Sequence, residues 1–356
     1  MTASTNRTFR VGITADAYDE AGRLQFADMG LGVLDSAPNV VYEPLSARTS
    51  VLDAHHLDRF HGVLVVTAQV TAESLVRSGN LLAFSRVGVG YDQVDIAACT
   101  ASDVAVLIAA GAVDRSMAEA TVGWMIALTH HMLVKDRMVR TGRWNRSQYM
   151  GRELRDRTFG AIGFGGIARA TAQLLGTFGM KQPLAYDPYL DEGTAQTLGV
   201  RLVDLDTLLA SSDFVSLHCP LNDETRGLVG ARELAKMKPD SYLINTSRGG
   251  LVDEDALLDA LAAGRISGAA IDCFAEEPVS HPERWSRLDN VLLAPHCLGW
   301  TDELFRDMGR AACLGIVDLA QGKRPRGVVN AEVFDRPGFQ EKWGRLRIAS
   351  SGDRNE

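Results

Sequence analysis

The segment Thr158–Ala168, TFGAIGFGGIA, decides the fold of this chain, because it joins an apolar strand, a glycine turn and the start of a helix. Gly163 is expected to form the tight turn, and Gly165 to let the backbone approach a bound pyrophosphate. Ala168 is small enough for the helix to pack against the strand, so the first N–H groups of the helix face the phosphates. This order is typical of a dinucleotide-binding unit, although such a turn needs glycine with or without a ligand.

An acidic side chain stands at the end of the next predicted strand, where it can distinguish two dinucleotides. Asp187 lies 22 residues after Gly165. A carboxylate at this distance accepts hydrogen bonds from the adenosine ribose and repels a 2′-phosphate. The spacing therefore favours NAD over NADP, although an Asp in an Asp-Pro pair is also a common turn former.

Short apolar or β-branched runs alternate with helical patterns along the whole chain. Such alternation is typical of βαβ units whose parallel sheet is buried on both faces, so the predicted fold class is α/β. The predicted strands are Phe9–Thr14, Gly62–Val66, Leu81–Ser85, Val104–Ile108, Thr158–Ile162, Pro183–Tyr186, Phe214–Leu217, Tyr242–Asn245, Gly268–Asp272 and Val291–Leu293.

Two long helices stand out from this alternation. The first is predicted to begin at Ser116, with Glu119 three residues later as in a capping box, and to continue to Gly142. Small residues at 109–112 precede it and suggest a crossing between domains. The second helix is predicted to begin near Thr301 and to end near Gly322.

The composition limits the partners that this protein can bind. The chain has 356 residues, with 37 Lys and Arg against 45 Asp and Glu, so its formal net charge is −8. Nucleic acids and anionic membranes attract basic surfaces, so neither is expected and a small molecule is favoured. A chain of this length exceeds the size at which one core usually stops growing, which predicts two domains.

The sequence also predicts a cytoplasmic protein without a structural disulfide or a metal. No apolar run reaches the roughly 18 residues of a membrane span, and the first ten residues lack the apolar core of a signal peptide. The five cysteines are scattered and contain no Cys-x-x-Cys pair, as expected of reduced intracellular thiols.

Polar residues gather just after the last predicted strands, at the sheet edge where ligands bind in this class of fold. Arg248, Asp272 and His296 each end or follow a strand, and Glu277 lies in the loop between the last two. Arg offers a planar fork to a carboxylate, and His passes a proton to or from a carbonyl oxygen. A neighbouring Glu stabilises the charged imidazolium, so this set suits acid–base chemistry near neutral pH.

Together these motifs resemble the D-isomer-specific 2-hydroxyacid dehydrogenase family. The resemblance covers roughly residues 60–330 and follows the order of the family's motifs. The stretches that carry it, besides the glycine turn, are RVGVGYDQVD (86–95), HCPLNDET (218–225), NTSRGGLVDEDAL (245–257), GAAIDCFAEEP (268–278) and LLAPHCLGW (292–300).

The resemblance implies two Rossmann-like/flavodoxin-like α/β domains with parallel sheets and an active site in the cleft between them. The substrate-binding domain is expected at residues 1–112 and 301–356, and the NAD-binding Rossmann domain at residues 113–300. Relatives use the helix that begins near Ser116 to dimerise, so a homodimer is expected.

The family's catalytic residues match Arg248, Glu277 and His296 of this chain. The resemblance implies that Arg248 holds a 2-ketoacid while NADH delivers hydride to C2, and that protonated His296 donates to the carbonyl oxygen. Glu277 is expected to keep His296 protonated and oriented, and Asp272 to receive the nicotinamide carboxamide.

The resemblance extends to residues that contact substrate and cofactor. Val89 and Gly90 match the loop whose N–H groups bind the substrate carboxylate, and Arg86 at its start could meet a distal anionic group or be structurally paired. The expected cofactor-binding residues are Gly163, Gly165, Gly166, Ile167, Asp187, His218, Pro220, Thr225, Thr246, Asp272 and Gly299.

The chain departs from the family pattern at two places. Gly166 stands where many members carry a basic residue beside the phosphates, so pyrophosphate binding is expected to depend more on backbone amides. Trp300 is bulkier than the residues common at its position, and could either form the floor of the substrate pocket or pack between domains.

Two rival functions fit the same fold. Formate oxidation is disfavoured because the family's formate enzymes have Gln where this chain has Glu277. An NAD(H)-sensing corepressor could retain the catalytic residues, and the absence of long disordered extensions is the argument against it. Fold alone does not separate these functions.

Overall fold

The computed structural model describes residues 8–46 and 48–348, which divide into two compact units. The first unit is Met1–Val113 with Thr301–Glu356, and the second is Asp114–Trp300. Each unit contains its own sheet, and every ladder within both sheets is parallel. The α/β class predicted from the alternating pattern is therefore confirmed.

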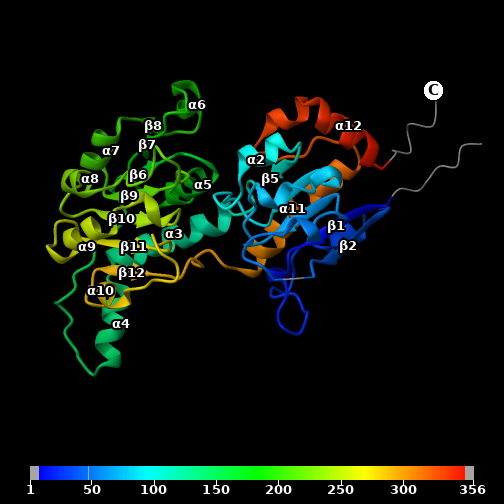
Figure 1. Cartoon of the computed structure of the whole chain (residues 1–356). Helices are drawn as coiled ribbons and strands as arrows, with labels where there is room; N and C mark the ends of the chain where they lie inside the picture. Colours follow the sequence, from blue (N-terminus) through cyan, green and yellow to red (C-terminus); the bar gives the residue numbers. More distant parts are fainter. Residues whose placement is uncertain (1–7, 47, 349–356) are drawn as a thin grey trace, which may run out of the picture. The chain divides into compact units, whose positions relative to one another are not determined.

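The first unit has a five-stranded sheet in the order β2-β1-β3-β4-β5 (Figure 1). This order is that of flavodoxin-like folds. The strands are β1 (Phe9–Ile13), β2 (Val40–Pro44), β3 (Gly62–Val65), β4 (Ala83–Arg86) and β5 (Ala105–Leu107). The α-helices of this unit are α1 (Gly32–Asp35), α2 (Ile96–Ala101), α11 (Asp302–Ala320) and α12 (Pro337–Leu346).

The second unit has a seven-stranded sheet in the order β12-β11-β10-β9-β6-β7-β8, shown in green to orange in Figure 1. Read from β8, the first six strands follow the Rossmann order 3-2-1-4-5-6. The strands are β6 (Phe159–Ile162), β7 (Leu184–Tyr186), β8 (Arg201–Leu202), β9 (Phe214–Leu217), β10 (Tyr242–Asn245), β11 (Gly268–Ile271) and β12 (Val291–Leu293). The α-helices are α3 (Asp114–Thr129), α4 (Met132–Arg140), α5 (Gly166–Leu175), α6 (Glu192–Thr197), α7 (Leu205–Ser211), α8 (Ala231–Lys236), α9 (Glu254–Ala262) and α10 (Pro282–Ser286).

Alternate residues of the central strands fill two separate cores in the second unit. Along β10, Tyr242 and Ile244 belong to a cluster with residues of α3 and α5, whereas Leu243 belongs to a cluster with residues of α7, α8 and α9. Successive side chains of a strand point to opposite faces, so both faces of this sheet are covered. The continuous apolar runs in the sequence reflect this double burial.

Two edge strands escaped prediction because neither contains a buried apolar run. The strand β2 contains Glu43 and Pro44, and none of its residues is fully buried, so it lacks an apolar run. The strand β8, at an edge of the second sheet, has only two residues, and neither is fully buried. An edge strand can do without an apolar run, and β2 and β8 therefore lack the signal that revealed the other strands.

The single helix predicted from Ser116 to Gly142 is wrong in two respects. It is two helices, α3 and α4, separated at His131, whose φ is 52°. The carbonyl of Thr129 accepts a hydrogen bond from the Arg152 N–H, so a distant segment takes the acceptor that a continuous helix needs. The helix also begins at Asp114, and the Ser116 hydroxyl donates to the Gly299 carbonyl instead of capping.

The second long helix, α11, begins where its cap predicts. Thr301 is extended, and its hydroxyl oxygen accepts a hydrogen bond from the Leu304 N–H at 3.1 Å. Such N-cap residues satisfy an N–H group that has no partner within the helix. Within residues 8–46 and 48–348, no helix is both long and apolar enough to cross a membrane.

Candidate active site

Three neighbouring strands bring the predicted catalytic residues to one edge of the second sheet. The strand β11 pairs with β10 on one side and with β12 on the other, with all three parallel. Arg248 follows β10, Glu277 lies in the loop after β11, and His296 follows β12. Because parallel strands end at the same edge, residues 248, 277 and 296 share it despite their separation in the sequence.

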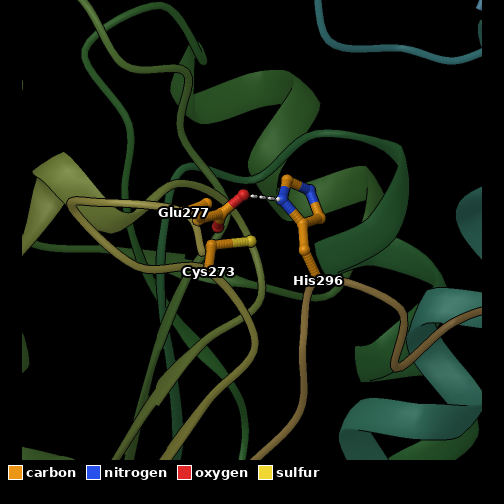
Figure 2. A group of neighbouring side chains, drawn as sticks. All are labelled: Cys273, Glu277 and His296. Carbon is orange, nitrogen blue, oxygen red and sulfur yellow. Dashed lines mark hydrogen bonds and ion pairs between the residues drawn. The ribbon is translucent and has the colours of Figure 1, made fainter. Parts of the chain in front are cut away.

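His296 and Glu277 are in direct contact. The His296 Nδ1 lies 2.8 Å from the Glu277 Oε2, and both side chains point toward each other from separate loops (Figure 2). They remain accessible, with 44% of the His296 side chain and 38% of the Glu277 side chain exposed. A carboxylate on one ring nitrogen fixes the imidazole and leaves Nε2 available to a reacting group.

The backbone orients both members of this pair. The other Glu277 oxygen, Oε1, accepts a hydrogen bond from the Phe274 N–H at 2.9 Å. His296 has a φ of 53°, and its N–H donates to the Asp272 carbonyl at 2.8 Å. A non-glycine residue with positive φ is uncommon and costs free energy, so the surrounding loop holds His296 in an orientation that it would not adopt alone.

Asp272 directly follows β11 and is buried beside the segment that carries His296. Its Oδ1 accepts hydrogen bonds from the N–H groups of Cys297 and Leu298, at 3.0 and 3.1 Å. Burial raises the pKa of Asp272 above its ordinary value, against the opposing effect of these two donors. The carboxylate thus joins the end of β11 to the segment that carries His296.

The Arg248 loop approaches the Glu277 loop closely because Gly249 has no side chain. A Cβ at position 249 would overlap the backbone of Phe274 and Ala275. Arg248 itself is half-buried, and its Nη1 donates to the Ser247 carbonyl at 2.7 Å. Gly249 is a structural requirement of the site that sequence reasoning missed, although it stands beside a predicted catalytic residue.

The dinucleotide turn adopts the expected geometry. Gly163 has a φ of 86°, and a Cβ there would lie 2.9 Å from the backbone of His218 and Cys219, so two features demand glycine. A Cβ at Gly165, in contrast, would meet open space. The space in front of the first turn of α5 is therefore open to a phosphate group.

Asp187 folds back onto this turn. Its Oδ2 accepts a hydrogen bond from the Phe164 N–H at 2.8 Å, and its Oδ1 accepts one from the Tyr189 N–H at 2.9 Å. The carboxylate therefore lies between the glycine turn and the end of β7. This placement suits contact with a ribose next to the phosphates.

Two residues that directly follow strands of this sheet hold buried polar atoms without a hydrogen-bond partner. These atoms are the hydroxyl of Thr246, after β10, and both ring nitrogens of His218, after β9. Burial lowers the pKa of His218 to about 4, so its ring is neutral at physiological pH. Buried polar atoms normally have partners, so these atoms fit a polar ligand such as a dinucleotide.

The other predicted cofactor-binding residues lie in loops of this unit or in the first turn of α5. Thr225 closes its own loop, because its hydroxyl donates to the Pro220 carbonyl at 2.7 Å. Gly299 accepts a hydrogen bond from Ser116 and packs against Met117, whose sulfur a Cβ at position 299 would overlap. Gly166 and Ile167 form the first turn of α5.

Sequence reasoning missed Asp114, which lies against the first turn of α5. A Cβ at Gly166 would overlap the Asp114 carboxylate. Burial raises the pKa of Asp114, and the charge of Arg169 opposes that shift. No local pattern signals this contact, because 52 residues separate the two positions.

The predicted substrate-binding residues belong to the first unit. Arg86 ends β4 and is buried, and Val89 and Gly90 follow it. The Arg86 Nε donates to the Gly90 carbonyl at 3.0 Å, and its Nη1 donates to the Val66 carbonyl at 2.7 Å. Arg86 thereby holds the backbone of the loop that contains Val89 and Gly90.

Comparison with known proteins identifies the family. Residues 122–297 match the model of the D-isomer specific 2-hydroxyacid dehydrogenase, NAD binding domain. A glyoxylate reductase from Thermofilum pendens is 37% identical over 276 residues, which cover 76% of this chain and 81% of that protein. The chain therefore belongs to the D-isomer-specific 2-hydroxyacid dehydrogenase family, and NAD(H) is the cofactor of its matched domain.

Two further relatives define the extent of the likeness. A D-3-phosphoglycerate dehydrogenase from Archaeoglobus fulgidus is 38% identical over 80% of this chain, but the chain spans only 54% of that longer protein. A crystal structure of a Pyrococcus horikoshii protein is similar with a TM-score of 0.78 and 27% identity, covering 96% of this chain and 99% of that one. The likeness in fold thus extends through nearly the whole chain.

Proposed function

We propose that this protein transfers hydride between NAD(H) and a 2-ketoacid or D-2-hydroxyacid. The observation that carries the proposal is the contact of 2.8 Å between His296 and Glu277 on the sheet that also carries the dinucleotide turn. A histidine oriented by a carboxylate can act as a general acid or base. Beside a nicotinamide that transfers hydride, such a histidine can supply the proton that completes the reduction of a carbonyl group. Membership of the family supports the same reaction.

In the reductive direction, the substrate carboxylate binds to Arg248 and to the N–H groups at Val89 and Gly90. NADH, when bound, supplies the hydride that reduces C2. Protonated His296 donates its Nε2 proton to the carbonyl oxygen, which becomes the hydroxyl of the product. Glu277 holds Nδ1 and stabilises the charged imidazole until that transfer. The reverse reaction uses neutral His296 as the base.

The cofactor is proposed to lie along the edge from the glycine turn to β12. Asp187 binds the adenosine ribose and disfavours a 2′-phosphate, and Asp272 and Thr246 lie on the nicotinamide side. The residues proposed to hold NAD are Gly163, Gly165, Gly166, Ile167, Asp187, His218, Pro220, Thr225, Thr246, Asp272 and Gly299.

Arg86 is proposed to act on substrate binding through the loop that it holds. Its hydrogen bonds to Gly90 and Val66 support a positioning role for the guanidinium. Direct contact with a distal anionic group of the substrate stays a prediction from the sequence. Arg86→Lys keeps the charge but loses the fork, so equal losses for short and phosphorylated ketoacids would favour the positioning role.

A homodimer is also proposed, formed by the second unit. Large apolar side chains are exposed on α4 and on the loop after it, including Val139, Trp144 at 78% and Met150 at 79%. An exposed group of such residues is typical of a protein–protein contact. Light scattering of the purified protein should give twice the chain mass, and Trp144→Arg should give a monomer.

The proposed location of the protein is the cytoplasm, where thiols stay reduced.

The proposed reaction is tested by following NADH and NADPH oxidation with a panel of 2-ketoacids. The panel contains glyoxylate, hydroxypyruvate, a branched aliphatic ketoacid, phenylpyruvate and a phosphorylated ketoacid. Turnover with NADH in preference to NADPH is expected. Binding of NADH without turnover of any member would contradict the proposed reaction and favour a nucleotide-sensing role.

A further inference from the structure

The acid–base pair has a third neighbour whose chemistry the proposed reaction does not use. Cys273 directly follows Asp272 at the end of β11, is buried, and is not part of a disulfide. Figure 2 shows its sulfur directed toward the His296 side of the pair. Among the residues that the structure describes, Cys273, Glu277 and His296 place one candidate ligand atom each within 4.8 Å of one another.

We propose that Cys273, Glu277 and His296 form a binding site for Zn²⁺, and that the bound ion reversibly switches off the reaction. Thiolate, imidazole and carboxylate are the three ligand types that zinc binds in proteins. Three protein ligands leave the fourth tetrahedral position for water or for an oxygen of the substrate. The metal site stands on the geometry of the cluster, whereas its inhibitory effect rests on the proposed function.

The spacing of the three groups, and the exposure of two of them, suit this ion. Bond lengths of about 2.0–2.3 Å to zinc place tetrahedral ligand atoms roughly 3.3–3.8 Å apart. Closure from the present spacing therefore requires a movement of about 1 Å, which the exposed side chains of Glu277 and His296 can make. Cys273 is buried and therefore holds its sulfur in a fixed place. Because that ligand is a thiolate, the site should prefer a thiophilic ion.

Zinc would remove the very contact that the reaction needs. The ion inserts between the His296 Nδ1 and the Glu277 carboxylate, which are now joined at 2.8 Å. The thiol proton of Cys273 and any proton on Nδ1 pass to solvent when the metal binds. With Nδ1 coordinated, the imidazole cannot become the imidazolium that gives its proton to the carbonyl oxygen, so turnover stops until the metal leaves.

Binding is tested first without turnover, by titrating the full-length protein with Co²⁺ as a spectroscopic substitute for zinc. We expect one ion per chain, a sulfur-to-cobalt charge-transfer band and displacement of the band by Zn²⁺. Cys273→Ser should remove the band, whereas Cys297→Ser is the matched control and should keep it. Absence of the band in the wild type, or its loss only in Cys297→Ser, would overturn the metal site.

Inhibition is tested by adding ZnCl₂ to the ketoacid assay and then a chelator. Reversible inhibition is expected, with the inhibition constant raised in Cys273→Ser by more than the roughly 10- to 100-fold that loss of an outer-shell partner costs. Equal inhibition of the wild type and Cys273→Ser would overturn the proposal. A cobalt band without turnover of any ketoacid would instead retain the metal site and remove the proposed function, so the two failures are distinguishable.

Discussion

The dinucleotide turn and the acid–base edge belong to one sheet but are built in opposite ways. At the turn, glycines leave space, so that backbone N–H groups and buried polar atoms can face a ligand. At the edge, exposed side chains are proposed to carry the chemistry, and backbone donors such as the Phe274 N–H orient them. An added methyl group at the turn should therefore lower stability or NADH binding. At the edge, removal of a side chain should lower kcat.

The largest expected effect is at the acid–base edge. His296→Asn should lower kcat by about 10²–10⁴-fold, because the proposed general acid is lost. Asn tolerates the positive φ of position 296, so the loop should keep its conformation. The measurement is kcat together with the NADH dissociation constant from fluorescence. An unchanged kcat would remove His296 from the mechanism, and a large loss of NADH affinity would show that the two regions are not separable.

Acid should lower the free energy of unfolding through His218, whose backbone lies beside Gly163 of the turn. The pKa of His218 is lowered by burial to about 4, against 6.5 for an exposed histidine. The unfolded chain therefore binds more protons between these values, and stability that is complete above pH 6.5 is lost as pH falls toward 4. The total loss is about 3 kcal/mol at 1.36 kcal/mol per pKa unit. Denaturant unfolding across this range should show the slope, and His218→Gln should reduce it.

The two glycines of the turn should respond differently to the same added methyl group. Gly163→Ala should destabilise the fold by about 1–3 kcal/mol, because its φ is positive and the new Cβ meets the backbone after β9. Gly165→Ala should leave the melting temperature nearly unchanged but weaken NADH binding by about ten-fold, or ~1.4 kcal/mol. Thermal unfolding and NADH fluorescence separate the two results. Equal effects of the two variants on stability would contradict this division.

The smallest expected effect concerns the carboxylate beside the turn. Asp114 lies against Gly166, at the helix end where N–H groups are proposed to bind phosphate. Asp114→Asn removes a negative charge there and should strengthen NADH binding by about 0.3–1 kcal/mol. Asp191→Asn, at the N-cap of α6, is a matched control and should not change NADH binding. Weaker binding in Asp114→Asn would show that the carboxylate supports the turn.

Much of the fold could be predicted because the inner strands and the glycine turn have local signals. Burial on both faces makes β6, β9, β10 and β11 continuous apolar runs, and all were found. The edge strands β2 and β8 lack that signal. The break at His131 escaped prediction because the Thr129 carbonyl is taken by Arg152, a residue 23 positions later in the chain.

By itself the sequence determined the α/β class, the glycine turn and the order of motifs that identifies the family, since each depends on residues close together in the chain. Tertiary structure alone decided which groups meet across loops. The contacts of His296 with Glu277, of Gly166 with Asp114, and of Cys273 with that acid–base pair depend on strand register and loop packing. Such contacts join residues from separate elements, and the free energy that selects them comes from burying the whole sheet rather than from any local pattern.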